Sequence, residues 1–180
     1  MVNIVDAKVS YLVNRGWSNP FLDAAMPIIS ELGTGETLFL VTVLIFILRR
    51  RKDKGRLSLL LFAGLAVTYY VVYFIKAAVA RPRPYMSMPY IVPFVAEKGF
   101  SFPSHHAAQA FAAATIASGF FRRWRVALFA AAGLVAFSRV YLGVHFLSDV
   151  AAGAAVGIAV GYAILAIGRQ SLFTASGQPG

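Results

Sequence analysis

Residues 57–75, LSLLLFAGLAVTYYVVYFI, contain no charged side chain and lie between Arg56 and Lys76. The stretch reaches the roughly 20 apolar residues that an α-helix needs to cross a bilayer. Other uncharged stretches lie on both sides of it, and one of them is equally long. The rest reach a spanning length only when flanking polar residues are included, so the sequence indicates about five membrane crossings. These other stretches are 37–48, 107–121, 126–138 and 150–168.

The composition agrees with a membrane protein. The chain is 59% hydrophobic and only 13% charged, with a mean hydropathy of +0.70, which leaves too few polar residues to cover one compact domain in water. The predicted fold class is all-α: a polytopic membrane helical bundle of five to six transmembrane helices, forming a single domain over residues 1–180. The chain has no cysteine, so disulfide bonds and thiolate chemistry are excluded.

The N-terminal residues 1–19 are predicted to be an interfacial segment. Residues 2–15 alternate loosely between apolar and polar side chains at helical spacing, which favours a helix lying on the membrane surface. The charges of Asp6, Lys8 and Arg15 are scattered through this segment. That layout does not match a cleaved signal peptide.

Residues 20–48 are long enough for one tilted helix, but Pro27 and Gly33 interrupt them. They therefore predict either a kinked helix or a helix pair, and a pair would raise the number of spans to six. At the other end of the chain, residues 171–180 are predicted to be a short polar tail.

The formal net charge of +10 raises the question of nucleic acid. The basic residues, however, concentrate in two short loops, and no pattern of aromatic and basic residues supports a nucleic-acid groove. With five crossings both loops lie on one side, which the bias of Lys and Arg identifies as the cytoplasm. We therefore expect a multi-pass protein of the plasma (inner) membrane with no nucleic-acid partner. The loops contain Arg49, Arg50, Arg51, Lys52, Lys54 and Arg56, and then Arg122, Arg123 and Arg125.

A second set of polar and ionisable residues gathers at the ends of the predicted spans. Such groups are costly at a membrane and are a hypothesis of function by default. The predicted topology places all of them at the outer, periplasmic side, and they include every histidine of the chain. The set consists of Lys76, Arg81, Arg83, Ser104, His105, His106, Arg139, His145 and Asp149.

Part of this set predicts a phosphate site. Lys76, Arg83 and Arg139 supply three cations, and the planar arginine side chains can bind two phosphate oxygens at a time. Ser104 follows Pro103 and precedes an apolar stretch. It is therefore placed to cap a helix whose first N–H groups remain available to an anion.

The remaining residues predict covalent catalysis. His145 and Asp149 are four residues apart and share a face if the stretch is helical, so the carboxylate can accept a hydrogen bond from one ring nitrogen. The other ring nitrogen is then a nucleophile. His106 is suited to protonate the departing oxygen and afterwards to activate water.

Three segments resemble the signature of the type 2 phosphatidic acid phosphatase (PAP2) superfamily. Residues 76–84, KAAVARPRP, contain a lysine and an Arg-Pro pair, Arg83-Pro84, with six residues between them. Residues 103–106, PSHH, match Pro-Ser-x-His, and residues 138–149, SRVYLGVHFLSD, match Ser-Arg followed by a histidine and an aspartate at fixed offsets. The three motifs occur in the order that the family has.

The resemblance implies a helical membrane fold and metal-independent dephosphorylation through a phosphohistidine, without a cofactor. It assigns His145 as the nucleophile, Asp149 as its partner and His106 as general acid and base. The phosphate ligands that it implies are Lys76, Arg83, Ser104 and Arg139.

Two further residues of the set, His105 and Arg81, are interpreted separately. His105 stands where many members of the family have glycine; it is included among the phosphate-binding candidates, with the alternative that its ring points away. Arg81 is interpreted as an interface anchor whose guanidinium reaches the lipid headgroups.

The same residues are also compatible with two other classes of site. His105, His106, His145 and Asp149 could form a zinc-like set, but adjacent histidines on a helix point in different directions and the nearby cations oppose a divalent ion. A transporter or channel for a phosphorylated anion is the alternative from a different class. It is disfavoured because the cluster lies at one face of the membrane.

The predicted substrate is a membrane lipid phosphate. A site built from helix ends at the membrane's edge admits a headgroup while the chain stays in lipid, and residues 85–102 are expected to cover it. The resemblance to compact bacterial members favours undecaprenyl pyrophosphate. Phosphatidylglycerol phosphate, phosphatidate and lipid A remain open.

Overall fold

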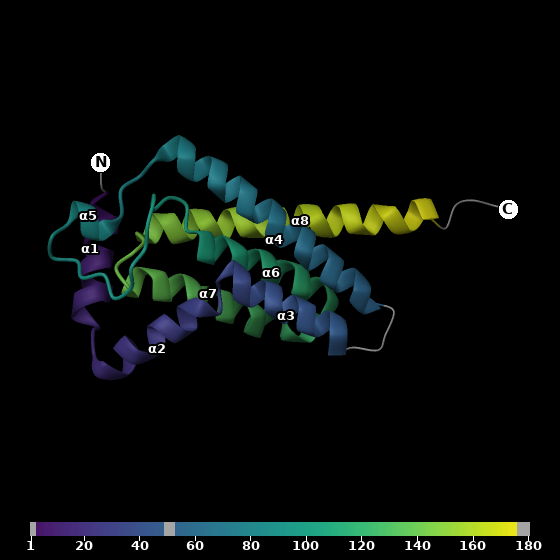
Figure 1. The fold of residues 1–180 in the computed structure, drawn as a ribbon, viewed down its shortest axis with the longest axis horizontal. Helices are drawn as coiled ribbons and strands as arrows, with labels where there is room; N and C mark the ends of the chain where they lie inside the picture. The colour runs from purple at the N-terminus through teal and green to yellow at the C-terminus, as the bar shows by residue number, and fades with distance from the viewer. Residues whose placement is uncertain (1–2, 49–52, 176–180) are drawn as a thin grey trace.

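The computed structural model describes residues 3–48 and 53–175, and this part of the chain is helical and contains no β-strand. The long helices run side by side, and α1 and α5 gather at one end of them, on the left of Figure 1. The elements are α1 (Ile4–Tyr11), the π-helical turn η1 (Leu12–Gly16), α2 (Pro20–Glu31), α3 (Gly35–Leu48), α4 (Asp53–Val79), α5 (Pro84–Ser87), α6 (His105–Phe120), the 3-10 turn η2 (Arg122–Trp124), α7 (Arg125–Tyr141) and α8 (Leu147–Ala175).

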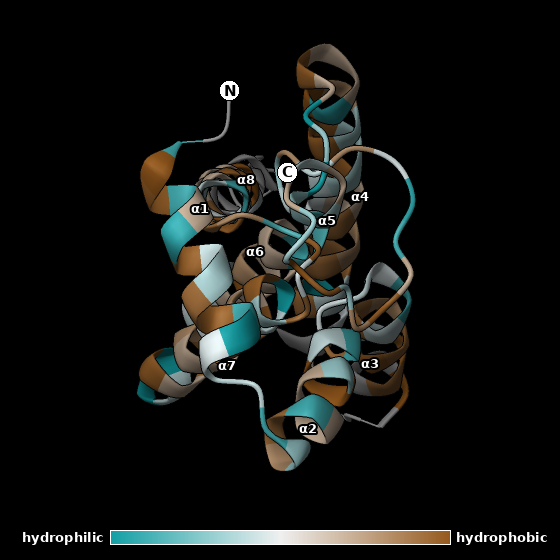
Figure 2. Ribbon diagram, turned by 90° about the vertical axis from the view of Figure 1, so that its left-hand side faces the viewer, coloured by the Kyte–Doolittle hydropathy of each residue, from teal (hydrophilic) through white to brown (hydrophobic). Residues whose placement is uncertain are grey.

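Helix α6 lies in the middle of the bundle. It packs against α8, α7 and α4, and the view from the end of the bundle shows these helices around it (Figure 2). Its sequence explains this position, because alanines such as Ala107, Ala108 and Ala112 are fully buried and allow neighbouring backbones to come close. Many large apolar side chains point outward from the surrounding helices, as expected where the outer solvent is lipid.

The contact between α6 and α8 depends on glycines. A Cβ atom on Gly153 would lie 2.4 Å from the carbonyl oxygen of Ser104, and one on Gly157 would lie 2.2 Å from that of Ala108. Real Cβ atoms do not approach oxygen so closely, so the two backbones can lie at this distance only because the side chains are absent. This packing places the first turn of α8 beside the first turn of α6.

The expected five to six crossings are not confirmed. Three segments within the described residues are long and apolar enough to cross a membrane: Gly55–Ser87, Arg122–Tyr141 and Leu147–Gly168. Helices α2 and α3 are bent by 62° at their break and add a fourth span if they count as one. The break lies at Gly33, and two helices that form one span correspond to the kinked alternative predicted for residues 20–48. Helix α6 has 16 residues and is about 24 Å long, shorter than the roughly 30 Å hydrocarbon core.

The chain's N-terminal segment is helical as predicted, but its placement on the membrane surface is not confirmed. Asp6, Ser10 and Asn14 follow one another at four-residue spacing and are buried, whereas Ile4 on the same helix is 70% exposed. The segment therefore turns its polar side toward the protein.

Two other predicted features lie at the edge of the described residues. Helix α8 continues to Ala175, so the first half of the predicted tail is helical, and residues 176–180 lie outside the described part. Residues 49–52 of the first basic loop also lie outside it.

The packing of α6 on α8 gives a first prediction. Gly157→Ala forces a methyl group against the Ala108 carbonyl and should destabilise the protein by about 1–3 kcal/mol, the usual cost of overpacking. Thermal unfolding in detergent measures the loss. Gly133→Ala on α7 is the matched control, because a Cβ there meets nothing within 4 Å. Equal melting temperatures for the two variants would contradict the close approach of α6 and α8.

Candidate active site

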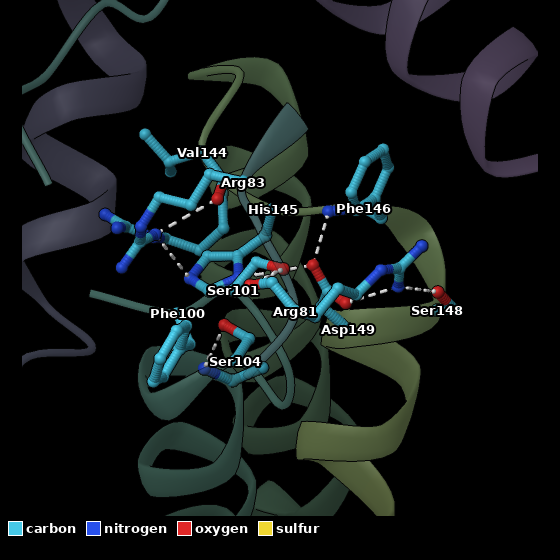
Figure 3. Close-up of polar contacts among 12 residues, drawn as sticks. Arg81, Arg83, Phe100, Ser101, Ser104, Val144, His145, Phe146, Ser148 and Asp149 are labelled. Atoms are coloured by element: carbon cyan, nitrogen blue, oxygen red, sulfur yellow. Dashed lines mark hydrogen bonds and ion pairs between the residues drawn. The ribbon is translucent and has the colours of Figure 1, made fainter. Parts of the chain in front are cut away.

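The predicted site residues come together at one end of the bundle. Lys76 lies in the last turn of α4, Arg83 precedes α5, and Arg139 lies in the last turn of α7. Helices α6 and α8 both begin here, so their first turns add further members of the set. Figure 3 shows that Arg83, His145, Ser104 and Asp149 are neighbours although they come from different elements.

His145 lies in the short connection between α7 and α8. Gly143 has a φ of 73°, a left-handed conformation that glycine adopts without strain, and it turns the chain back after α7. The N–H of His145 then donates to the carbonyl of Arg139 at 3.2 Å. The ring is only 2% exposed, so backbone and packing both fix its orientation.

The two ring nitrogens of His145 face different groups. Nδ1 lies 3.6 Å from Asp149 Oδ2, while Nε2 lies 3.4 Å from Arg83 Nη1. Asp149 is fully buried, and its Oδ2 accepts a hydrogen bond of 2.8 Å from the N–H of Phe146. Nε2 is therefore the nitrogen that faces the cations.

Burial holds the pKa of His145 well below its ordinary value, and the charges of Arg139, Arg83 and Lys76 lower it further. An imidazole with a lowered pKa is neutral at physiological pH. It therefore carries the lone pair that a nucleophile needs.

Three predicted phosphate ligands supply positive charge here. Arg83 and Arg139 are 3% and 2% exposed. Arg83 donates to the carbonyls of Val144 at 3.0 Å, Gly99 at 3.0 Å and Lys98 at 2.9 Å. The Lys76 ammonium donates to the carbonyl of Phe100 at 2.7 Å. Residues 98–100 of the segment over 85–102 therefore lie against these cations, while the prediction that the whole segment covers the site stays a prediction.

Ser104 caps α6 as predicted. Its hydroxyl accepts a hydrogen bond of 3.4 Å from the N–H of Ala107, and its own N–H donates to the Asp149 carbonyl at 2.9 Å. This second bond ties the start of α6 to the first turn of α8. His106, in the same first turn of α6, interacts electrostatically with Arg139 and His145.

The contacts of the His105 ring lie on the side of α4. Its Nε2 is 3.1 Å from Gln109 Nε2, and the ring packs edge-on against Tyr69 at 5.0 Å between centroids. This geometry fits the alternative that the side chain points away from the phosphate ligands. Its predicted part in phosphate binding stays a prediction.

The sequence reasoning missed Glu97. Its carboxylate forms ion pairs with both buried arginines, at 3.2 Å to Arg83 Nη2 and with the Nη2 of Arg139 through the other oxygen. Two guanidinium groups that share one carboxylate are arranged as they would be around two oxygens of a phosphate. Nothing local to Glu97 signalled this, because the contact joins it to Arg139 across 42 positions.

The interpretation of Arg81 as an interface anchor is wrong. Its side chain is only 17% exposed and pairs with two carboxylates, those of Asp6 at 2.8 Å and Asp149 at 2.6 Å. The guanidinium is therefore engaged inside the protein and does not reach toward headgroups. Asp6 is the second functional candidate that the sequence reasoning missed.

The zinc-like reading gains nothing from the structure. Across residues 3–48 and 53–175, no group of three or more His, Cys, Asp or Glu side chains is arranged to hold a metal ion. The positive charges of Arg83 and Arg139 lie next to the His145 ring instead.

Fold and site together define an integral membrane protein in which a buried histidine lies between a carboxylate and a cluster of cations. The chain belongs to the PAP2 superfamily, whose family model matches residues 57–172. It is a membrane hydrolase of the lipid phosphatase type found in that family.

Curated relatives and solved structures agree. The chain is 30% identical over 167 residues to phosphatidylglycerophosphatase B of Bacillus subtilis, covering 84% of this chain and 76% of the relative. It is 28% identical over 162 residues to lipid A 4'-phosphatase of Porphyromonas gingivalis, covering 84% and 68%.

Among solved structures, Aquifex aeolicus LpxE superimposes with a TM-score of 0.82 at 29% identity, over 91% of this chain and 96% of that one. The transmembrane PAP2-type phosphatidylglycerolphosphate phosphatase of Bacillus subtilis gives 0.78 at 27% identity, over 92% and 85%.

The position of Glu97 gives a second prediction. The Glu97 carboxylate is held within the protein and competes with any anion for Arg83 and Arg139. In Glu97→Gln the two arginines are no longer occupied by a carboxylate in most molecules. Inhibition by orthophosphate or vanadate should therefore become about tenfold stronger. Inhibition constants measured in detergent test this. Glu36→Gln, which removes an exposed charge on α3, should change them little. Weaker inhibition of Glu97→Gln would mean that the carboxylate supports the arginines more than it competes.

Proposed function

We propose that this protein hydrolyses a phosphate ester of a membrane lipid without a metal, through a phosphohistidine at His145. The observation that carries the proposal is that the two nitrogens of the His145 ring face different groups. Nε2 lies beside Arg83, and Nδ1 lies beside Asp149. A nucleophilic nitrogen is thereby presented to an anion-binding cluster, and a carboxylate stands behind it.

In the first half of the proposed reaction the phosphoryl group replaces the Glu97 carboxylate between Arg83 and Arg139. The buried Nε of Arg139 makes no hydrogen bond within the described part of the chain and is an available donor for a phosphate oxygen. His145 Nε2 attacks phosphorus, a P–N bond forms, and the P–O bond to the lipid breaks. The cations stabilise the charge on the phosphoryl oxygens, and Asp149 stabilises the positive charge that develops on the ring.

His106 is the proposed general acid in the first half of the reaction and the general base in the second. Burial and the charge of Arg139 lower the pKa of His106 to about 2, so the proposal requires the bound phosphate anion to offset these cations and let His106 take up a proton. His106 then gives this proton to the leaving lipid oxygen, which would otherwise depart as a poorly stabilised alkoxide. Water then enters the position of the lipid, His106 takes a proton from it, and the hydroxide attacks phosphorus. The P–N bond breaks, orthophosphate leaves, and His145 is restored.

The relatives narrow the proposed substrate. Those reported above are named for phosphatidylglycerol phosphate and lipid A, and the preference for undecaprenyl pyrophosphate finds no support among them. We therefore place a phosphomonoester lipid first, with phosphatidylglycerol phosphate as the leading candidate.

The proposal also includes the side of the membrane on which the site lies. The basic turn η2 follows the C-terminal end of α6, whereas His105 lies at the N-terminal end of that helix. By the bias of Lys and Arg toward the cytoplasm, the site then faces the outer side of the plasma membrane.

The third prediction tests the activity itself. Purified protein in detergent with EDTA should release orthophosphate from phosphatidylglycerol phosphate faster than from undecaprenyl pyrophosphate, phosphatidate or lipid A, because protein cations replace a metal. Phosphate release detected with malachite green measures each rate. Activity that is lost in EDTA and restored by one divalent ion would contradict the mechanism. A complete lack of release, together with uptake of a phosphorylated solute into vesicles, would favour the transporter alternative.

The fourth prediction separates the roles of the two histidines. His145→Ala should abolish turnover, and Asp149→Asn should lower kcat about 100-fold, as carboxylate partners of catalytic histidines do. His106→Ala should slow release of the lipid far more than release of p-nitrophenolate, because only the alkoxide needs a proton. Rapid-quench trapping of acid-labile phosphate locates the intermediate. Labelled phosphate on His106 would reverse the proposed roles.

A further inference from the structure

Helix α1 lies beside the start of α8 at the site end of the bundle (Figures 1 and 2). We propose that Asp6 on this helix is a positioning residue of the reaction, acting through Arg81 on the carboxylate of Asp149. The inference rests on the proposed function and extends the site beyond the three PAP2 motifs.

Arg81 holds Asp149 in one orientation. Its Nη1 donates to Asp149 Oδ1 at 2.6 Å, while the other oxygen of the same carboxylate accepts from the N–H of Phe146 and faces His145. The Arg81 Cζ lies 4.0 Å from the centroid of the Phe146 ring, which fixes the plane of the guanidinium. Because each oxygen of Asp149 has its own partner, the carboxylate cannot rotate away from the ring without losing one of them (Figure 3).

Asp6 in turn holds Arg81. Its Oδ2 accepts a hydrogen bond of 2.8 Å from Arg81 Nη2, and its Oδ1 accepts one of 2.9 Å from the N–H of Ser148. Ser148 is in the first turn of α8, where N–H groups have no partner within the helix. The hydroxyl of Ser148 links the same groups, since it contacts both Asp6 and Arg81. One carboxylate of α1 therefore fixes Arg81 and the start of α8 together.

The charges explain why a second carboxylate matters. Asp6 is 3% exposed, and burial alone would raise its pKa, but hydrogen bonds from Arg81 and Ser148 outweigh burial and lower it below the ordinary value. Asp6 is therefore ionised. With both carboxylates ionised, Asp6, Arg81 and Asp149 together carry one net negative charge, and Asp149 is the member that faces His145. Without Asp6, Arg81 and Asp149 would form a neutral pair, and that pair would stabilise the positive ring of the transition state less well.

The test is a double-mutant cycle on phosphate release. Asp6→Asn should lower kcat about tenfold, the size typical of groups that orient a histidine from behind, and should leave KM nearly unchanged because Arg83 and Arg139 are untouched. In the Asp149→Asn background the same change should have almost no further effect, because the residue through which it acts is already lost.

Asn3→Ala is the matched control. It removes the side chain that accepts from the Val5 N–H at 3.1 Å and caps α1, so it loosens the same helix without altering the charge chain. Its kcat, corrected for the folded fraction, should stay near that of the unsubstituted protein. If Asp6→Asn does not fold, Arg81→Lys takes its place in the cycle, because it keeps the charge but cannot bridge two carboxylates.

The outcomes are distinct. Full kcat in Asp6→Asn, or an equal fractional loss in both backgrounds, would overturn the inference while leaving the proposed function intact. An equal loss in Asn3→Ala would show that α1 acts only as a structural support. Absence of lipid phosphate hydrolysis in the unsubstituted protein would overturn the proposed function, and the inference with it.

Discussion

Arg83 and Arg139 bring two guanidinium groups, each almost fully buried, to the two oxygens of the Glu97 carboxylate. Two like charges removed from water at one place are stable only if an anion shares the site. In the structure that anion is Glu97, and in the proposed reaction it is the phosphoryl group. The surrounding carbonyls of residues 98–100 and of Val144 supply the rest of the compensation. The segment over 85–102 is therefore ordered by the same charges that are proposed to bind the substrate.

Behind these cations, charges of opposite sign alternate. Asp149 lies behind His145, Arg81 behind Asp149, and Asp6 behind Arg81. Buried charges are tolerated when each has a partner with good geometry. In this series of charged groups, Arg81 has ion-pair partners in Asp6 and Asp149. The series also gives the N-terminal helix a chemical reason to dock with its polar side inward, since Asp6 and Asn14 find hydrogen-bond partners there.

The helices supply the frame for these groups. The glycines of α8 allow it to approach α6 so closely that Ser104 donates its N–H to the carbonyl of Asp149. One backbone hydrogen bond thus connects the start of α6, which is proposed to bind phosphate, to Asp149 in the first turn of α8. A bulkier pair of helices would separate the proposed general acid from the nucleophile, because both are carried by first turns or by the residues just before them.

Much of this protein was determined by local sequence. Uncharged stretches fix a helical membrane protein, because a backbone in lipid must satisfy its hydrogen bonds internally. The spacing of the three motifs identified the family, and the placement of Pro103 and Ser104 predicted the cap of α6. His145 and Asp149 could be placed together from their four-residue separation, but His145 precedes α8, and its Nδ1 lies 3.6 Å from Asp149 Oδ2 without the predicted hydrogen bond. The basic residues of η2 could be assigned to the opposite end of the bundle by counting spans.

Only the tertiary structure decided the rest. Arg81 looked like an interface anchor because its two carboxylate partners are 75 and 68 positions away, and no periodicity reports contacts of that range. Glu97 lies in an irregular segment, where the sequence carries no repeating signal to place a side chain. The number of crossings depends on the bend between α2 and α3 and on the burial of the short α6, both of which are set by packing against neighbours. Local chemistry could indicate the proposed reacting groups. The pairing of the buried charges was decided by how distant segments fold together. Burial requires each ionised group to have a partner, and that partner can come from any part of the chain.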